Sequence, residues 1–319
     1  FEYAEVDELG SIIHKDYTDY HIQHVLDLKL VNREAIAKAN LKVVVDAVNS
    51  VGGTVIPALL KALGVKEVVE LNCEPTGRFA HNPEPIPENL IQISEKIKEC
   101  GADLGIVVDP DVDRLALVCE NGEMFVEEYT LVAVADYVLK HTPGNTVSNL
   151  SSSRALRDVT LAHGQQYNAA AVGEVNVVTK MKETNTVIGG EGNGGVIYPE
   201  SHYGRDALVG VGLFLSHFVA EGKSMTVLKA TYPQYFISKN KLTLSPDMDV
   251  DKILEGLKKK YASEEITDID GVKIDFKDGW VHLRKSNTEP IIRIYSESKD
   301  EAAANQLAEE VIKVAQSLY

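Results

Sequence analysis

The sequence predicts an α/β protein: two similar α/β domains with mixed sheets between helices, then a smaller α+β C-terminal domain. Strand and helix patterns alternate as far as Pro233, which is typical of layered α/β units with largely parallel sheets. Beyond Pro233 the strands follow one another more directly. At 319 residues the chain is also too long for one ordinary core. We therefore expect domains at 14–121, 122–233 and 234–319, after a charged, unpatterned remnant of a preceding domain or linker at 1–13.

The first domain is expected to build its sheet from apolar, β-branched runs of strand length. Its predicted elements are a strand at 41–46, a helix at 54–63, a strand at 67–71, a helix at 87–100 and strands at 104–108 and 115–119. Pro87 at the start of its second helix and Gly101 just past the end are residues that commonly mark helix boundaries.

The alternation of strands and helices continues in the second domain and changes in the third. The second domain is predicted to hold helices at 129–140, 154–163, 174–181 and 206–219, with strands at 146–150, 167–172, 186–188 and 196–198. The third is predicted to hold a first strand, a helix at 249–261, strands at 272–276, 280–284 and 291–295, and a helix from Glu301. Successive strands with few helices favour the smaller α+β domain.

Composition excludes several classes of function. A net charge of −16 argues against binding a nucleic-acid backbone, which needs clustered Lys and Arg. No uncharged apolar run approaches the length that spans a membrane, and the acidic start lacks the apolar core of a signal peptide. The three cysteines have no metal-ligand spacing and indicate reduced thiols in a cytoplasmic protein.

The run Asp109-Pro110-Asp111-Val112-Asp113-Arg114 lies between two predicted strands and places a carboxylate at every second residue. The carboxylates would repel one another, and a hard divalent cation such as Mg²⁺ would remove that repulsion. Arg114 can add a fixed positive charge for an anionic ligand. Two alternatives remain. One is a solvated acidic turn, and the other is an EF-hand calcium loop, which would need Gly at its sixth position, where Arg114 stands.

Two further loops carry ligand-binding residue types. Gly189–Gly195 has five glycines in seven positions, which allow close backbone approach, and its Glu191 and Asn193 can hold vicinal hydroxyls. The second loop offers guanidinium, hydroxyl and amide groups, which together suit a phosphate. Its candidate ligands are Arg284, Ser286, Asn287, Thr288 and Arg293. A plain glycine turn and a solvated hairpin tip are the respective alternatives.

With the three loops together, the chain resembles the α-D-phosphohexomutase family of phosphoglucomutase, phosphomannomutase and phosphoglucosamine mutase. Asp109–Arg114 matches the family's Asp-x-Asp-x-Asp-Arg metal loop, and Gly190–Gly195 its Gly-Glu-x-x-Gly sugar loop. Arg284–Pro290 with Arg293 matches the Arg-x-Ser-Asn-Thr-Glu-Pro-x-x-Arg phosphate loop. The resemblance covers essentially the whole chain and agrees in order and spacing.

The resemblance implies an enzyme that interconverts hexose 1-phosphate and hexose 6-phosphate through a hexose bisphosphate. It implies Mg²⁺ on Asp109, Asp111 and Asp113, and sugar hydroxyls on Glu191. It also implies four domains, with a phosphoserine nucleophile in the first. The expected partners are hexose phosphates and bisphosphates and that missing domain of the same polypeptide.

The match fails at the nucleophile, because no Ser-His-Asn-Pro type loop occurs in this sequence. Ala80-His81-Asn82-Pro83 has no hydroxyl at its first position and is interpreted as a structural loop. Ser151–Ser153 is interpreted as the cap of the following helix. The chain is therefore expected to be a fragment, containing domains two to four, that is inactive alone. A natural, non-catalytic phosphosugar-binding module is the alternative.

A second departure is Gly195, where many family members have a His proposed as general acid or base. We consider His202 as a replacement, with an ordinary surface His as the alternative. Asn287 resembles glucose and mannose members, so phosphoglucomutase/phosphomannomutase activity is the first expectation. The glycine loop also resembles members of glucosamine specificity, which leaves phosphoglucosamine mutase as the alternative.

Overall fold

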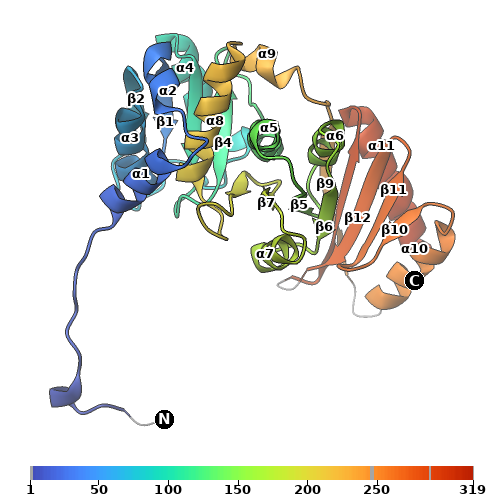
Figure 1. Ribbon diagram of the computed structural model, residues 1–319. Coiled ribbons are helices and arrows are strands. Elements are labelled where there is room, and N and C mark those ends of the chain that lie inside the picture. The colour runs from blue at the N-terminus through green and yellow to red at the C-terminus, as the bar shows by residue number, and fades with distance from the viewer. Residues whose placement is uncertain (1–2, 245–247, 287–288, 319) are drawn as a thin grey trace.

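Three sheets organise the molecule in the computed structural model, which describes residues 3–244, 248–286 and 289–318 (Figure 1). The first sheet has the order β2-β1-β3-β4, with β1 parallel to β2 and β3, and β3 antiparallel to β4. Its strands are β1 (Lys42–Asp46), β2 (Glu67–Leu71), β3 (Leu104–Val108) and β4 (Leu115–Cys119). Each has the residues and bounds of a predicted apolar run, to within one residue.

The second sheet repeats this topology with the order β6-β5-β7-β8. Two parallel pairings are again followed by one antiparallel pairing, between β7 and β8. Its strands are β5 (Thr146–Asn149), β6 (Tyr167–Ala170), β7 (Ile188–Glu191) and β8 (Gly195–Ile197). The predicted pair of similar α/β units with mixed sheets is therefore confirmed.

The third sheet is antiparallel throughout, in the order β10-β11-β12-β13-β9. Its strands are β9 (Phe236–Thr243), β10 (Glu265–Thr267), β11 (Val272–Phe276), β12 (Gly279–Lys285) and β13 (Ile291–Ser298). Helices α10 (Val250–Lys260) and α11 (Glu301–Gln316) cover one face, and α6 of the second unit lies beside the other (Figure 1). This unit is the predicted smaller α+β domain.

Helices surround the two mixed sheets, and α1 and α2 pack on the helices α3 and α8. The helices of the first two units are α1 (Thr18–Asp27), α2 (Arg33–Ala39), α3 (Gly52–Leu63), α4 (Ile91–Cys100), α5 (Glu127–His141), α6 (Ala155–Ala162), α7 (Glu174–Glu183), α8 (Ala207–Glu221) and α9 (Met225–Lys229), with short 3-10 turns η1 (Val6–Glu8) in the N-terminal tail and η2 (Pro87–Asn89). Within the described residues, no helix combines the length and apolar character needed to cross a lipid bilayer.

Several details differ from the sequence-based prediction. The helix expected at 87–100 is divided into the turn η2 and the helix α4. Gly189–Glu191, expected as loop, belongs to β7, and Gly195 opens β8, because both segments hydrogen-bond as sheet partners despite their glycines. Helices α1, α2 and α9 and the short strand β10 were not predicted, because each buries no more than two of its residues and so gives a weak periodic signal.

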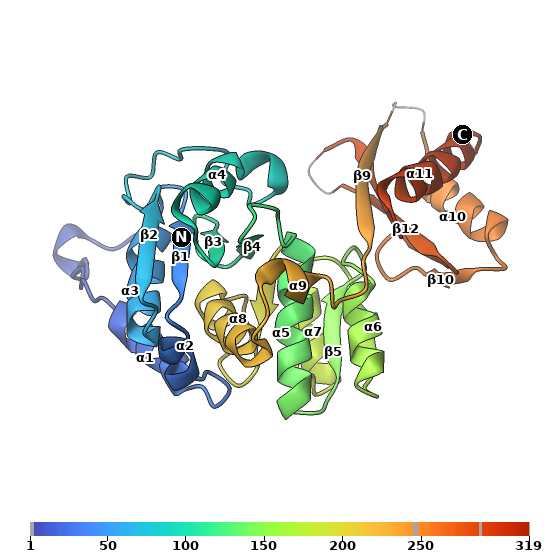
Figure 2. The same cartoon turned by 90° about the horizontal axis from the view of Figure 1, so that it is seen from above.

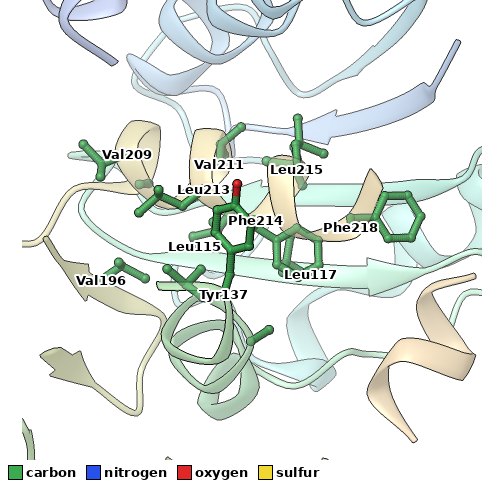
Figure 3. Packing of buried hydrophobic residues seen from close by; sticks show 14 of the residues in the cluster. Leu115, Leu117, Tyr137, Val196, Val209, Val211, Leu213, Phe214, Leu215 and Phe218 are labelled. Atoms are coloured by element: carbon green, nitrogen blue, oxygen red, sulfur yellow. The ribbon is translucent and has the colours of Figure 1, made fainter. Parts of the chain in front are cut away.

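Helix α8 joins the first two units into one apolar core. It belongs to the second unit in sequence, yet it lies between α5 and the helices of the first unit (Figure 2). Phe214, Leu213 and Val211 of α8 are at most 1% exposed. They gather with Leu115 and Leu117 of β4, Tyr137 of α5 and Val196 of β8 (Figure 3). The shared core fixes the loop after β3 relative to the loop between β7 and β8. The predicted domain limits remain a prediction.

Replacing Phe214 by Ala should lower the free energy of unfolding by about 3–5 kcal/mol, because the cavity opens at the junction of both units. Phe214 is fully buried and makes an edge-on contact with Phe125 at 5.6 Å between ring centroids. Urea unfolding followed by circular dichroism measures the change. Val175→Ala is the matched control, because Val175 is 78% exposed and its loss should change stability by no more than about 0.5 kcal/mol. Equal midpoints for the two variants would contradict this account of the core.

Candidate functional site

The acidic loop begins where β3 ends and closes where β4 starts. Both strands are buried along their whole length, so the apolar runs hold the two ends of the loop. Asp109 Oδ1 accepts hydrogen bonds from the backbone N–H groups of Asp113 and Arg114, both at 3.1 Å. Val112 has φ 61°, a left-handed conformation that turns the chain back toward β4. The carboxylate of Asp109 is therefore an internal support of the loop.

Asp109, Asp111 and Asp113 converge, with one carboxylate oxygen from each lying within 4.8 Å of the others. Asp109 is 4% exposed, and its burial, together with its charged neighbours Asp113 and Asp111, raises its pKa to about 7. The Asp113 Oδ1 atom is buried and has no hydrogen-bond partner. Three hard oxygen donors, one of them without a hydrogen bond, fit a divalent cation such as Mg²⁺. The strand at Leu115–Cys119 excludes an EF-hand, whose loop would continue through it.

The glycine loop lies directly against the acidic loop. The Leu115 N–H donates to the Gly194 carbonyl oxygen at 2.9 Å, and Arg114 forms an antiparallel bridge with Gly195. Gly194 has φ 91°, and a Cβ there would lie 2.5 Å from the Leu115 carbonyl oxygen. Only glycine permits this approach. Two of the three sequence-predicted loops thus form one continuous surface.

Glu191 is held at this junction by three hydrogen bonds to its carboxylate. Its Oε1 accepts from Asn149 Nδ2 at 2.8 Å and from the Gly173 N–H at 3.2 Å. Its Oε2 accepts from Arg205 Nη1 at 2.9 Å, and the residue is 5% exposed. Asn193 Oδ1 accepts from the Gly195 N–H at 3.2 Å. These bonds fix the orientation of Glu191 beside the acidic loop.

Arg205 is a site residue that the sequence analysis missed. Its guanidinium also bonds the Asp113 carboxylate, so it links the acidic loop with Glu191. Sequence alone gave no signal for this role, because Arg205 lies 92 positions from Asp113 and belongs to none of the three loops. Its neighbour Asp206 begins α8 by accepting from the Val209 N–H at 3.0 Å.

His202 bonds Asp206 and does not contact the acidic loop through any described hydrogen bond. Its Nε2 lies 2.9 Å from Asp206 Oδ2, and His21 Nε2 lies 2.8 Å from the same oxygen. The bond to Asp206 raises the pKa of His21. His21, which comes from the unpredicted helix α1, lines a cavity of about 400 Å³ together with Asp111 and Arg205. The role considered for His202 remains a prediction.

Two segments that the sequence analysis compared with a nucleophile loop, Ala80–Pro83 and Ser151–Ser153, both make contacts within the fold. His81 Nε2 lies 3.2 Å from Asp46 Oδ2, so the Ala80–Pro83 segment is tied to the end of β1. Ser153 Oγ accepts from the Ala155 N–H at 3.1 Å at the start of α6. Ser152 Oγ accepts from the Gly192 N–H at 2.9 Å and thereby supports the glycine loop.

The third loop joins β12 and β13, with Arg284 directly opposite Arg293 in the sheet. The Arg284 Nε atom is buried without a hydrogen-bond partner, while Arg293 Nη2 lies 3.3 Å from Glu289 Oε2. The Ser286 N–H donates to the Ile291 carbonyl oxygen at 3.0 Å. Asn287 and Thr288 lie outside the described residues. The cations of this loop are therefore close together on one hairpin.

Arg293 borders a cavity of about 530 Å³ that all three units line. Glu84 and Glu88 come from the first unit, Glu128 from the second and Lys239 from the third. Glu128 connects this cavity to the glycine loop, because a Cβ on Gly192 would lie 1.9 Å from its Oε2 atom. Burial holds the pKa of Glu128 well above its usual range. The acidic loop does not line this cavity.

Buried charges hold the third unit against the second. Arg154 Nη2 donates to Asp275 Oδ1 at 2.9 Å and to the Gly279 carbonyl oxygen at 2.8 Å. Its backbone N–H donates to Glu297 Oε1 at 3.0 Å, and Trp280 Nε1 donates to the same oxygen at 2.7 Å. This polar network sets the position of the third unit, and with it that of the third loop.

Comparison with known proteins agrees with this geometry. Models of the phosphoglucomutase/phosphomannomutase family match residues 16–122 as alpha/beta/alpha domain II, 127–235 as alpha/beta/alpha domain III and 242–314 as the C-terminal domain. The chain belongs to the phosphoglucomutase/phosphomannomutase family. The resemblance predicted from the three loops is confirmed at this level.

Individual members of the family are similar over nearly the whole chain. A phosphoglucomutase/phosphomannomutase of Thermococcus kodakarensis is 38% identical over 98% of this chain and 69% of its own length. A phosphoglucosamine/phosphogalactosamine mutase of Sulfurisphaera tokodaii is 33% identical over 90% of this chain and 64% of its own length. The crystal structure of a family protein from Burkholderia thailandensis matches with a TM-score of 0.81 and 28% identity, covering 94% of this chain and 65% of that one. The chain thus spans 64–69% of the length of these family members.

Arg154→Ala should destabilise the third unit by about 3–5 kcal/mol, because it removes the buried guanidinium that pairs with Asp275 and donates to the Gly279 carbonyl oxygen. Trp280, the single tryptophan, lies in the network and reports its unfolding by fluorescence in urea. Arg157→Ala is the control, since this side chain is 34% exposed and its ion pairs are 3.5 and 3.8 Å long, which predicts a loss below about 1 kcal/mol. An unchanged Trp280 transition in Arg154→Ala would show that the network does not hold the unit.

Proposed function

We propose that this chain carries the metal, sugar and phosphate loops of a phosphohexomutase that interconverts hexose 1-phosphate and hexose 6-phosphate. The observation that carries the proposal is the junction of Leu115 with Gly194, which sets the three aspartates beside the oriented carboxylate of Glu191. A cation on the aspartates and a hydroxyl-binding carboxylate next to it suit a phosphorylated sugar.

Each loop has a separate role in the proposed mechanism. Asp109, Asp111 and Asp113 would hold Mg²⁺, which when bound neutralises charge on the phosphoryl group in transfer. Arg114, whose Nε lies 3.4 Å from Asp109 Oδ2, adds a fixed positive charge at the same place. Glu191, with Asn193, would accept sugar hydroxyls and so orient the ring.

The phosphate group that does not react would lie on the third loop. Arg284 and Arg293 stand opposite each other across two strands, so their guanidinium groups can hold one phosphate from two sides. Ser286, Asn287 and Thr288 would add hydroxyl and amide donors. Because the loop is on the third unit, the separation of the two phosphate positions is set by how this unit packs on the second.

The proposed reaction also needs a phosphoserine, and the 319 residues hold no Ser-His-Asn-Pro type loop. We therefore expect this chain alone to bind its ligands without turnover and to need a nucleophile domain of the same polypeptide. His202 is retained as a candidate acid or base. A non-catalytic phosphosugar-binding module is the alternative, and it predicts no turnover under any condition.

Glucose and mannose phosphates are the first proposed substrates. Asn287 supports this choice, as does the name of the Thermococcus kodakarensis relative, phosphoglucomutase/phosphomannomutase. Glucosamine phosphate is the second candidate, supported by the Gly-Glu-Gly-Asn-Gly-Gly loop and by relatives named as phosphoglucosamine mutases. The free thiols Cys73, Cys100 and Cys119 support a cytoplasmic location.

Asp111→Asn should weaken Mg²⁺ binding at least about tenfold, because one of three ligand charges is lost. Asp111 is exposed, so its replacement should not disturb folding. Isothermal titration calorimetry with MgCl₂ measures the dissociation constant. Asp251→Asn on the exposed face of α10 is the control and should bind like the unaltered chain. Absence of Mg²⁺ binding to the unaltered chain would reject the proposed metal site.

Arg293→Ala should weaken binding of glucose 1-phosphate about tenfold, because a charge-assisted contact to the phosphate is lost. Calorimetry with glucose 1-phosphate, mannose 1-phosphate and glucosamine 1-phosphate measures both the loss and the sugar preference. Phosphorus NMR in the presence of MgCl₂ and glucose 1,6-bisphosphate tests turnover, and the chain alone should give none. Lys313→Ala, which alters an exposed cation on α11, is the control. Equal affinity in Arg293→Ala and Lys313→Ala would remove the third loop from the proposed site.

A further inference from the structure

Arg205 is the cation that ties the acidic loop to the glycine loop. It lies just before α8, between Gly204 and the N-cap residue Asp206. Its side chain is 15% exposed, so the guanidinium is largely removed from solvent. A cation at this depth requires partners for its charge and its hydrogen-bond donors.

The guanidinium meets three carboxylates from three separate segments. Nη2 bonds the Asp113 carboxylate through its Oδ2 atom, and Nη1 donates to Glu191 Oε2 at 2.9 Å. Nε lies 3.4 Å from Glu174 Oε2, at the start of α7. The backbone N–H of Arg205 donates to Glu174 Oε1 at 3.0 Å. The planar fork thus contacts one proposed metal ligand and the proposed sugar ligand at once, through two different nitrogens in a fixed geometry.

Gly195 provides the space for this side chain. A Cβ on Gly195 would lie 2.3 Å from Arg205 Cδ and 3.0 Å from Arg205 Cγ. The φ angle of Gly195 is not positive, so the backbone itself would accept an alanine. The absent side chain at this position is therefore explained by the passage of the Arg205 side chain over the first residue of β8.

We propose that Arg205 is a positioning residue that acts as an internal counter-ion, balancing Asp113 and orienting Glu191 before Mg²⁺ and sugar are bound. The inference rests on the proposed function and extends it to a residue outside the three loops. Mg²⁺ shares Asp113 with the guanidinium, so metal binds against the positive charge of Arg205. The sugar, in contrast, meets a Glu191 carboxylate that Arg205 holds in place.

The two roles predict opposite effects when the charge is removed. Loss of a neighbouring positive charge strengthens the attraction between Mg²⁺ and the aspartates. Loss of the hydrogen bond to Glu191 leaves its Oε2 atom without a donor and weakens hydroxyl binding. If Arg205 merely supported the loops, its replacement would weaken the binding of both ligands. The sign of the change in Mg²⁺ affinity therefore separates a counter-ion from a structural support.

Calorimetric titration of the 319-residue chain with MgCl₂ and, separately, with glucose 1-phosphate provides the test. Arg205→Gln should bind Mg²⁺ at least about fivefold more tightly at low ionic strength, where charges are least screened. It should bind glucose 1-phosphate at least about fivefold more weakly, since an oriented charged contact is lost. Arg205→Lys keeps the charge and loses the fork, so its Mg²⁺ affinity should stay within about twofold while glucose 1-phosphate binding falls.

Gly195→Ala supplies an independent variant that leaves Arg205 itself unchanged. Its Cβ displaces the Arg205 side chain, so the variant should change both affinities in the same directions as Arg205→Gln. The double variant Gly195→Ala/Arg205→Gln should add little to Arg205→Gln alone, because both changes remove the same contacts. Additive effects would overturn the proposal. Gly195→Ala alone also keeps the proposal testable if Arg205→Gln fails to fold.

The outcomes distinguish this inference from the proposed function. If the unaltered chain binds neither Mg²⁺ nor glucose 1-phosphate, the proposed function fails and the role of Arg205 fails with it. If the unaltered chain binds both ligands but Arg205→Gln lowers the affinity for Mg²⁺ or leaves both affinities unchanged, the proposed function stands and the counter-ion role is wrong. Tighter binding of Mg²⁺ together with weaker binding of glucose 1-phosphate in Arg205→Gln supports the counter-ion role.

Discussion

The contact between the acidic loop and the glycine loop is the constraint on which the rest of the site depends. It consists of a 2.9 Å hydrogen bond from the Leu115 N–H to the Gly194 carbonyl oxygen, in a place that leaves no room for a side chain on Gly194. The contact brings Glu191 toward three aspartates that already repel one another. Such a concentration of negative charge needs compensating positive charge, and Arg114 and Arg205 supply part of that positive charge.

The apolar core explains why this crowded arrangement can persist. Helix α8 packs against both the first and the second unit, so the acidic loop and the glycine loop are attached to one rigid core. Its first residue follows Asp206, whose carboxylate accepts hydrogen bonds from the Val209 N–H and contacts His21 and His202. Burial of α8 thus positions Arg205 over Gly195 as a consequence of folding.

The sequence predicted the parts of the candidate site that consist of contiguous residues. It did not predict the parts formed by residues that are distant along the chain. The acidic loop follows a buried strand, so its place and its convergent carboxylates could be predicted from spacing alone. Arg205 could not, because its partners Asp113 and Glu191 lie 92 and 14 positions away. Helix α1 was missed because it buries mainly Ile22 and Val25, which is too weak a periodic signal.

The three loops differ in the kind of interaction that places them. The acidic and glycine loops share the apolar core around α8, so separating them would expose buried hydrophobic surface to water. The third loop instead depends on Arg154 and its bonds to Asp275, Gly279 and Glu297. Hydrogen bonds and ion pairs can be exchanged for water at lower cost than a core can be opened, because water satisfies the same groups. An adjustment of the distance between the third loop and the other two loops is therefore cheapest at the Arg154 interface, while the three aspartates and Glu191 stay in fixed register.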